Sequence, residues 1–160
     1  MNATKVTSLE QLQQLRPSMP DVVLAGGVFD LLHVGHVNHL GDARAAGKTL
    51  IVHIASDARV KQKKGVHVPL QPDLERAAII AALQDVDYVF IADVPHYHKS
   101  LLEALHPDKL FFNQEAYSPE IAQYLRELKN SPEIIVSNRP KNHHSSALIK
   151  KIRSMPETGK

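Results

Sequence analysis

The feature that most constrains the fold of this chain is a regular alternation of short apolar runs with longer amphipathic stretches. Runs of four to six residues, rich in β-branched and aromatic side chains, occur at positions 22–25, 50–55, 88–92, 109–112 and 133–136. This length and composition are typical of buried strands.

Between these runs, apolar residues recur at steps of three and four, as they do along one face of a helix. Such stretches lie at 37–43, 74–81, 101–105 and 121–128. Strands that alternate with helices predict right-handed crossovers and a parallel sheet that is covered on both faces. We therefore expect an α/β fold, a Rossmann-like three-layer sandwich with a parallel sheet of about five strands.

Local signals mark where several of the helices begin and end. Residues 8–11 fit a capping box for a short leading helix. Ser118, followed by proline, is typical of a helix start. Gly47 follows the first long helix, where a residue in the left-handed conformation is expected.

Length and composition limit the classes of protein to which the chain can belong. The 160 residues predict one domain over positions 1–153, followed by a frayed polar tail at 154–160. The absence of cysteine excludes disulfides and thiolate metal sites. A net charge of +2 predicts no nucleic-acid partner. No apolar run has membrane-spanning length and the N-terminus does not resemble a signal peptide, so we expect a cytoplasmic protein without a membrane partner.

The junction between the first apolar run and the next helix carries glycines and histidines. Gly26 and Gly27 end the run, and His33 and His36 follow on either side of Gly35. Parallel α/β sheets bind ligands at the carboxyl ends of strands, and a glycine turn lets backbone N–H groups approach a phosphate closely. Two imidazoles three residues apart in a first helical turn point to the same side. There they could donate hydrogen bonds to a phosphate as charge builds up in a transition state.

The segment GGVFDLLHVGHVNHL strongly resembles the signature of the cytidylyltransferase-like nucleotidyltransferases. This superfamily includes heptose-1-phosphate adenylyltransferase, glycerol-3-phosphate cytidylyltransferase and archaeal FAD synthetase. The resemblance implies an enzyme that transfers a nucleoside monophosphate from ATP or CTP to a phosphorylated small molecule and releases pyrophosphate. It also implies Mg²⁺ bound with the triphosphate, no metal ligands from protein side chains, and a homodimer.

The resemblance assigns roles to residues around this junction. His33 and His36 are expected to contact the triphosphate as catalytic residues. Asp30 is expected chiefly to maintain the structure of the site. The residues expected in the nucleotide site are Gly27, Val28, Phe29, Asp30 and Gly35.

Three further segments resemble motifs of the same family. Residues 55–65 resemble its second-strand exit and basic loop, in which Lys61 and Lys64 are expected to act in catalysis. Arg76 falls where relatives face the acceptor, and a guanidinium gives bidentate phosphate contacts. The C-terminal residues expected to bind the nucleotide are Arg139, Ser145 and Ser146. The structural alternatives are a solvated basic run, an exposed helix arginine and helix capping by the serines.

The match to the family is imperfect at 113–117 and 142–144, where relatives bind the base and the acceptor. These departures bear on the substrate more than on the reaction class. The leading helix and the Gly-Val-Phe-Asp turn resemble heptose-1-phosphate adenylyltransferases. The Lys-Gln-Lys-Lys run and the Arg-Pro-Lys at 139–141 resemble glycerol-3-phosphate cytidylyltransferase. We expect a sugar-1-phosphate adenylyltransferase of the heptose type, with the cytidylyltransferase as the alternative.

Two hypotheses assign the chain a different kind of function. A protein that binds a nucleotide without turnover would account for the altered segments. A histidine metal site would use His96 with His98, and His143 with His144. The chain offers such a site no cysteine and no fixed carboxylate spacing.

Overall fold

The computed structural model describes residues 5–128, 131–139 and 145–155. Within them, five strands pair in parallel in the order β3-β2-β1-β4-β5. The strands are β1 (Val22–Gly27), β2 (Thr49–Ala55), β3 (Tyr88–Ala92), β4 (Lys109–Phe112) and β5 (Glu133–Val136). The predicted parallel sheet is confirmed, and the expected strand ends are correct to within two residues.

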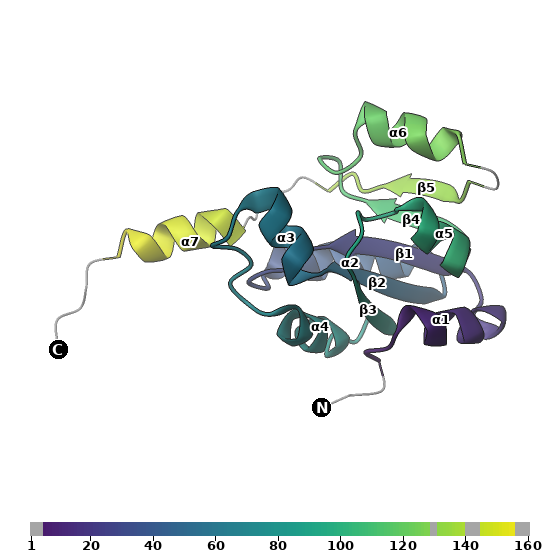
Figure 1. Cartoon of the computed structure of the whole chain (residues 1–160), viewed down its shortest axis with the longest axis horizontal. Helices are drawn as coiled ribbons and strands as arrows, with labels where there is room; N and C mark the ends of the chain where they lie inside the picture. The colour runs from purple at the N-terminus through teal and green to yellow at the C-terminus, as the bar shows by residue number, and fades with distance from the viewer. Residues whose placement is uncertain (1–4, 129–130, 140–144, 156–160) are drawn as a thin grey trace.

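Helices cover the sheet on both faces (Figure 1). The α-helices are α1 (Leu9–Leu15), α2 (Val34–Ala45), α3 (Asp57–Lys64), α4 (Asp73–Ala81), α5 (Lys99–Leu105), α6 (Pro119–Arg126) and α7 (Ser145–Arg153), and a short 3-10 helix spans Arg16–Ser18. The helices α2 and α4 pack on one face, and α1, α5 and α6 pack on the other. At the carboxyl ends of the strands, α7 extends away from the body of the molecule (Figure 1).

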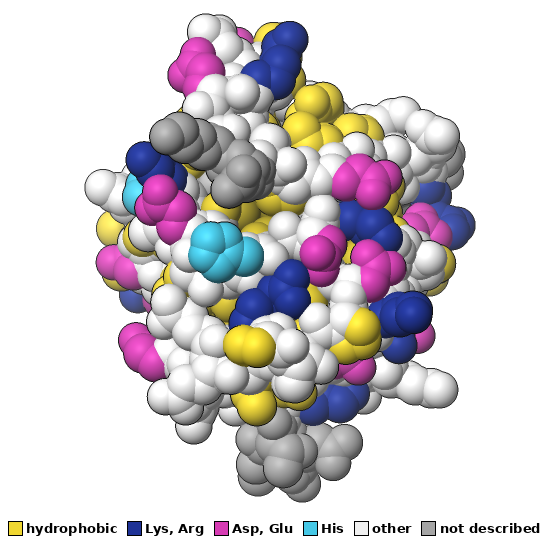
Figure 2. All heavy atoms as spheres, turned by 90° about the vertical axis from the view of Figure 1, so that its right-hand side faces the viewer, with side chains coloured by type: hydrophobic (Ala, Val, Ile, Leu, Met, Phe, Trp, Pro, Cys, Tyr) yellow, Lys and Arg dark blue, Asp and Glu magenta, His cyan; other side chains and the backbone are white. Residues whose placement is uncertain are grey.

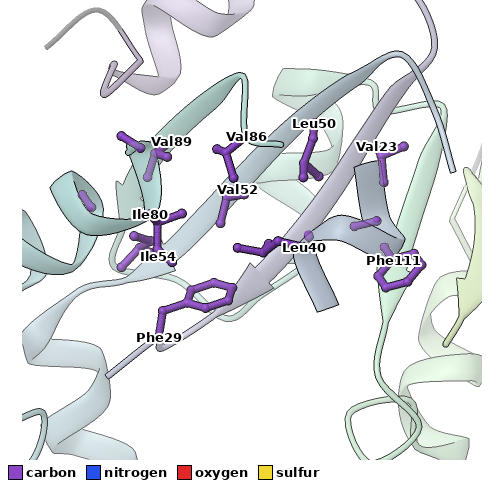
Figure 3. Close-up of a cluster of buried hydrophobic side chains, with 14 residues drawn as sticks. Val23, Phe29, Leu40, Leu50, Val52, Ile54, Ile80, Val86, Val89 and Phe111 are labelled. Atoms are coloured by element: carbon purple, nitrogen blue, oxygen red, sulfur yellow. The ribbon is translucent and has the colours of Figure 1, made fainter. Parts of the chain in front are cut away.

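Alternation along the strands sends neighbouring side chains into two separate cores. The core beneath α2 and α4 contains Phe29, Leu40 and Ile80 (Figure 3). The second core lies beneath α1, α5 and α6. Consequently Gly26 and Gly27, the last residues of β1, face opposite sides of the sheet.

The predicted helix starts are confirmed at both positions. The hydroxyl of Ser8 accepts a hydrogen bond from the backbone N–H of Gln11, and the side chain of Gln11 accepts one from the backbone N–H of Ser8. Ser118 caps α6 by accepting from the N–H of Ile121. These side chains satisfy N–H groups that the first helical turn leaves without partners.

Two local predictions are corrected by the structure. Ala46, the residue that caps the C-terminus of α2, is in the right-handed conformation, and Gly47 does not have a left-handed φ. Glycine is needed there for space, because a Cβ would lie 2.5 Å from Cγ2 of Val23 and 2.6 Å from the carbonyl oxygen of Asp21. The basic segment expected as a loop forms α3, and Gly65 follows it with a φ of +97°.

The order of the sheet reverses between β1 and β4, because β2 and β3 lie on one side of β1 and β4 and β5 on the other. These two strands stay paired only as far as Ala25 and Phe111. Beyond this point the hydroxyl of Tyr97 accepts a hydrogen bond from the N–H of Gly26 (3.1 Å) and donates one to the carbonyl of Phe111 (2.6 Å). Open α/β sheets bind ligands at such a reversal, so the carboxyl end of β1 is the expected site.

The opposite end of the molecule, at the amino ends of the strands, faces the viewer in Figure 2. Positively and negatively charged side chains are interspersed over this surface. None of the helices in the described ranges has the length and apolar character needed to cross a bilayer.

Candidate functional site

The loop after β1 has an unusual backbone conformation. Phe29 and Leu31 adopt φ values of +54° and +50°, a region that is unfavourable for large side chains. The buried Phe29 ring lies against Gly27, where a Cβ would be 2.7 Å from two of its ring atoms. Glycine at this position therefore allows the loop to fold back over the end of the strand.

Asp30 ties this loop to a second segment. Its carboxylate accepts hydrogen bonds from the backbone N–H groups of Leu70 (2.9 Å) and Gln71 (3.1 Å). The side-chain oxygen of Gln71 in turn accepts from the N–H of Leu31 (3.2 Å). These bonds support the structural role that the sequence implied for Asp30.

His33 and His36, here called the α2 histidines, lie side by side at the start of α2. Their rings stack with centroids 3.8 Å apart and 17° between the planes, and His36 also meets Phe29 with centroids 5.4 Å apart. His33 is the N-cap residue of α2, and Gly35 adds no side chain to the first turn. The prediction that both imidazoles lie on one side is confirmed. The N–H groups and the dipole of a helix N-terminus make this a suitable place for a phosphate.

Arg76 is completely buried. The acceptors of its guanidinium are the backbone carbonyls of Gln71 (3.0 Å), Val28 (2.5 Å) and Ala55 (2.9 Å) and the carboxylate of Asp57 (2.7 Å). Arg76 therefore joins the exits of β1 and β2 to the beginning of α3. These contacts favour a structural role, and contact with an acceptor substrate stays a prediction.

The lysines predicted to act in catalysis lie on α3. Lys61 and Lys64 are exposed in its last turn, together with Lys63, which the sequence analysis did not single out. Because α3 follows β2, the structure brings these ammonium groups to the same end of the sheet as the α2 histidines. Their exposure leaves them accessible to a charged ligand.

The C-terminal motif reaches the loop after β1. Ser145 is the first residue of α7, and its hydroxyl donates a hydrogen bond to the carbonyl oxygen of Asp30 (2.6 Å). Ser146 follows it in the first turn, and its side chain lies outside the described atoms. The bond from Ser145 docks α7 on the loop, a contact that the sequence analysis did not predict.

Arg139 forms an ion pair with Asp42 of α2. Its Nε and Nη2 atoms donate to the two carboxylate oxygens at 2.8 and 2.7 Å, and the hydrogen bond lowers the pKa of Asp42. Both residues line a shallow, open depression of about 540 Å³, together with Phe111 and residues 135–138. A concave site of this volume can accommodate a nucleobase.

The structure brings together a second pair of histidines, His53 and His96, which we call the inner histidines. The sequence did not predict this pairing. His53 lies in β2, is 1% exposed and stacks on Phe90 with centroids 5.1 Å apart. Its Nδ1 atom lies 3.1 Å from Nδ1 of His96. The sequence had suggested His98 as the partner of His96. No local signal could have found His53, because only pairing within the sheet brings it to His96.

Burial determines the charge of the inner histidines. It lowers the pKa of His53 to about 4, and burial together with the nearby His53 and the cations of α3 lowers the pKa of His96 to about 3. Both imidazoles are therefore neutral at pH 7.

Because of the inner histidines, we expect the free energy of unfolding to fall as the pH falls. Both folded-state pKa values lie below the unfolded value near 6.5, so the unfolded chain binds more protons between about pH 6.5 and pH 3. Each histidine then lowers the free energy of unfolding by up to about 1.4 kcal/mol per pH unit. Urea unfolding from pH 7 to pH 4 measures the slope, which should be shallower for His96→Asn.

His106→Asn is the matched control for this measurement. His106 is exposed at the other end of the sheet and has a φ of +42°, which asparagine tolerates. It should keep the wild-type slope. Equal slopes for all three proteins would contradict the assignment to the inner pair.

The described residues hold no group of three or more His, Asp or Glu side chains that could bind a metal ion. His98 instead accepts a hydrogen bond at Nδ1 from the backbone N–H of Ser100 (3.3 Å) at the start of α5. His143 and His144 lie outside the described residues. The metal-site reading therefore gains no support from the described part of the chain.

Comparison with known proteins shows the family to which this chain is similar. Residues 24–156 match the family described as Cytidylyltransferase-like. The chain is 37% identical over 138 residues to the bifunctional protein HldE of Salmonella arizonae, and the same values hold for that of Salmonella newport. The match covers 85% of this chain and 28% of those relatives. The chain therefore spans little more than a quarter of their length.

Solved structures share the fold at lower identity. A lipopolysaccharide core biosynthesis protein from Thermoplasma volcanium aligns with a TM-score of 0.66 and 22% identity, covering 76% of this chain and 99% of that one. A pantoate-β-alanine ligase from Francisella tularensis aligns with a TM-score of 0.57 and 18% identity, covering 94% of this chain and 78% of that one. Such likeness shows a common architecture.

Proposed function

Because the chain belongs to the cytidylyltransferase-like family of nucleotidyltransferases, we propose that it transfers AMP from ATP to a sugar 1-phosphate of the heptose type and releases pyrophosphate. The observation that carries this proposal is the stacked pair of His33 and His36 at the N-terminus of α2, where the order of the sheet reverses. Similarity to the bifunctional proteins HldE, and the resemblance of the leading segment to heptose-1-phosphate adenylyltransferases, support this acceptor.

The proposed reaction is an in-line displacement at the α-phosphorus of the nucleotide. A phosphate oxygen of the acceptor attacks, the bond between the α-phosphorus and the α–β bridging oxygen breaks, and pyrophosphate leaves with that electron pair. The substrate is the Mg²⁺ complex of the triphosphate, in which phosphate oxygens hold the ion. Catalysis then consists of positioning and of stabilising charge, without a covalent intermediate on the protein.

The chain's own groups contribute to this reaction from α2, from α3 and from the segment after β5. The α2 histidines donate hydrogen bonds from ring N–H groups to the α-phosphate oxygens, and the helix N-terminus adds a favourable dipole. Lys61 and Lys64 on α3 neutralise phosphate charge as it moves toward the leaving group. Arg139 borders the depression that would hold the base and ribose.

Cytidylyl transfer to glycerol 3-phosphate is the second candidate. The cluster of Lys61, Lys63 and Lys64 on α3, within a run that resembles the glycerol-3-phosphate enzyme, favours it. A pyrophosphate-release assay separates the candidates when ATP and CTP are each offered with heptose 1-phosphate, hexose 1-phosphates and glycerol 3-phosphate. Pyrophosphate release with ATP and a sugar 1-phosphate is the expected result. Calorimetric nucleotide binding without release for any pair would instead identify a non-catalytic binding protein.

We expect Asp42 to compete weakly with the nucleotide for the guanidinium of Arg139. Asp42→Asn frees the guanidinium and should lower the KM for the nucleotide by no more than about fivefold, since exposed ion pairs contribute little free energy. Arg139→Ala should raise the same KM. Steady-state kinetics of both variants test the assignment, and a fall in KM for Arg139→Ala would contradict it.

A further inference from the structure

The inner histidines take no part in the phosphate chemistry proposed above. His53 is the register partner of Gly26, and both point to the face covered by α1 and α5. The His96 ring lies on that glycine, where a Cβ would be 2.8 Å from Nδ1. The pair is therefore on the opposite face of the sheet from the α2 histidines, but at the same carboxyl end.

The contacts of His53 determine which of its nitrogens carries the proton. Its Nε2 atom faces the carbonyl oxygen of Ala92 at 3.4 Å, and a carbonyl oxygen can only accept, so this nitrogen carries hydrogen. In a neutral ring, Nδ1 then has a lone pair and accepts from Nδ1 of His96 at 3.1 Å. His96 is thus protonated at Nδ1 and has a lone pair at Nε2. The neutral state that this tautomer requires agrees with the lowered pKa values of both rings.

The lone pair of His96 lies at Nε2, on a different edge of the ring from the covered Nδ1 atom. The Nδ1 edge of the ring is covered by Gly26 and His53, whereas the residue as a whole is partly exposed. Within the described ranges, Nε2 makes no hydrogen bond, and it is not one of the buried polar atoms without a partner. A group that enters from solvent can therefore reach it.

Cations of α3 lie within electrostatic range of this acceptor. The charges of Lys63, Arg59 and Lys64 all act on the His96 ring. A phosphate suits such cations, whereas the lone pair of a neutral imidazole repels a phosphate oxygen and suits a hydroxyl donor. The combination fits a ligand that carries both a phosphate and a hydroxyl group.

We propose that His96 is a specificity-determining residue that accepts, at Nε2, a hydrogen bond from a hydroxyl group of the phosphorylated acceptor. His53 acts as a positioning residue, because its bond to the carbonyl of Ala92 fixes the tautomer of His96. The acceptor is then a polyol or sugar phosphate whose phosphate points to α3. The identity of this ligand as the acceptor rests on the proposed nucleotidyl transfer.

The variant that tests the proposal is His96→Asn. The asparagine amide can keep a donor near the position of Nδ1, and so the bond to His53, but it has no group at the position of Nε2. Gly26→Ala provides a second variant, since its Cβ would push the intact His96 ring from its place. His106→Asn, at the far end of the sheet, is the control with unchanged binding.

The probes are two matched pairs of ligands, mannose 1-phosphate with cyclohexyl phosphate, and glycerol 3-phosphate with propyl phosphate. Calorimetry in the presence of a non-hydrolysable ATP analogue measures binding without turnover. The wild-type protein should prefer the hydroxylated member of at least one pair, and both variants should reduce this preference about fivefold to tenfold. An unchanged preference in His96→Asn for both pairs, or no preference in the wild-type protein, overturns the proposal.

Imidazole ¹⁵N NMR spectra at pH 7 supply a readout that a merely structural role would not move. They should show His53 protonated at Nε2 and His96 at Nδ1, with the Nε2 signal of His96 shifting when the hydroxylated ligand is added. A cationic His96 or the other tautomer contradicts the mechanism. Because neither measurement needs turnover, a failure of the proposed transfer would appear separately, as the absence of pyrophosphate release.

Discussion

Replacing His36 with alanine is expected to lower kcat for pyrophosphate release about a hundredfold, which corresponds to roughly 2.7 kcal/mol of transition-state stabilisation. The reason is that its N–H donor meets charge that builds up on the α-phosphate only during the displacement. The KM for the nucleotide should change much less than kcat. Steady-state kinetics with saturating acceptor measure the effect.

His36→Phe separates the donor from the packing of the ring. Phenylalanine keeps a ring beside His33 and Phe29 but has no N–H group, so kcat should fall as far as in the alanine variant while the melting temperature stays near the wild-type value. His106→Asn should keep kcat within about twofold. Full turnover in His36→Phe would show that the imidazole is needed only for packing.

Replacing Arg76 with alanine is expected to cost about 3–5 kcal/mol of unfolding free energy, the usual cost of removing one partner from a buried ion pair. The substitution leaves the carbonyls of Val28 and Ala55 and the carboxylate of Asp57 without their donor. In a chain of this length the melting temperature should fall by roughly 10 °C. Thermal unfolding without substrate provides the measurement.

Arg126→Ala is the control for this prediction. Arg126 is exposed on α6 and, among the described residues, donates only to the carbonyl of Ala122 in its own helix. Its loss should therefore change the unfolding free energy by less than about 0.5 kcal/mol. Steady-state kinetics of Arg76→Ala, combined with its unfolding data, separate the two roles of Arg76. Unchanged stability combined with a raised KM for the acceptor would favour direct substrate contact over the structural role.

The parts of the fold that follow from local sequence could be predicted. Each strand is a short apolar run, and the Ser8 and Ser118 caps depend on neighbours three residues away, so their signals lie within a few positions. The pairing of His33 and His36 is equally local, because one helical turn brings them together.

The rest depends on contacts between distant segments. Nothing near Arg76 indicates that the carbonyls of Val28 and Ala55 will surround it, because these acceptors arrive from the ends of two other strands. His53 and His96 meet through the pairing and packing of the sheet. The sequence also predicted a loop at 57–64, a segment that is basic and has few apolar residues. In the structure these residues form a helix that Ser56 caps.

The two glycines that end β1 leave space on opposite faces of the sheet, each for a different ring. Gly27 accommodates the Phe29 ring of the loop after β1, and Gly26 accommodates the His96 ring on the opposite face of the sheet. We expect a change in one layer to leave the packing of the other intact, because the two rings lie on opposite faces of the sheet. The roles proposed for His96 and for the α2 histidines then imply that acceptor selectivity can change through substitutions behind the sheet without a change in the loop that carries the α2 histidines.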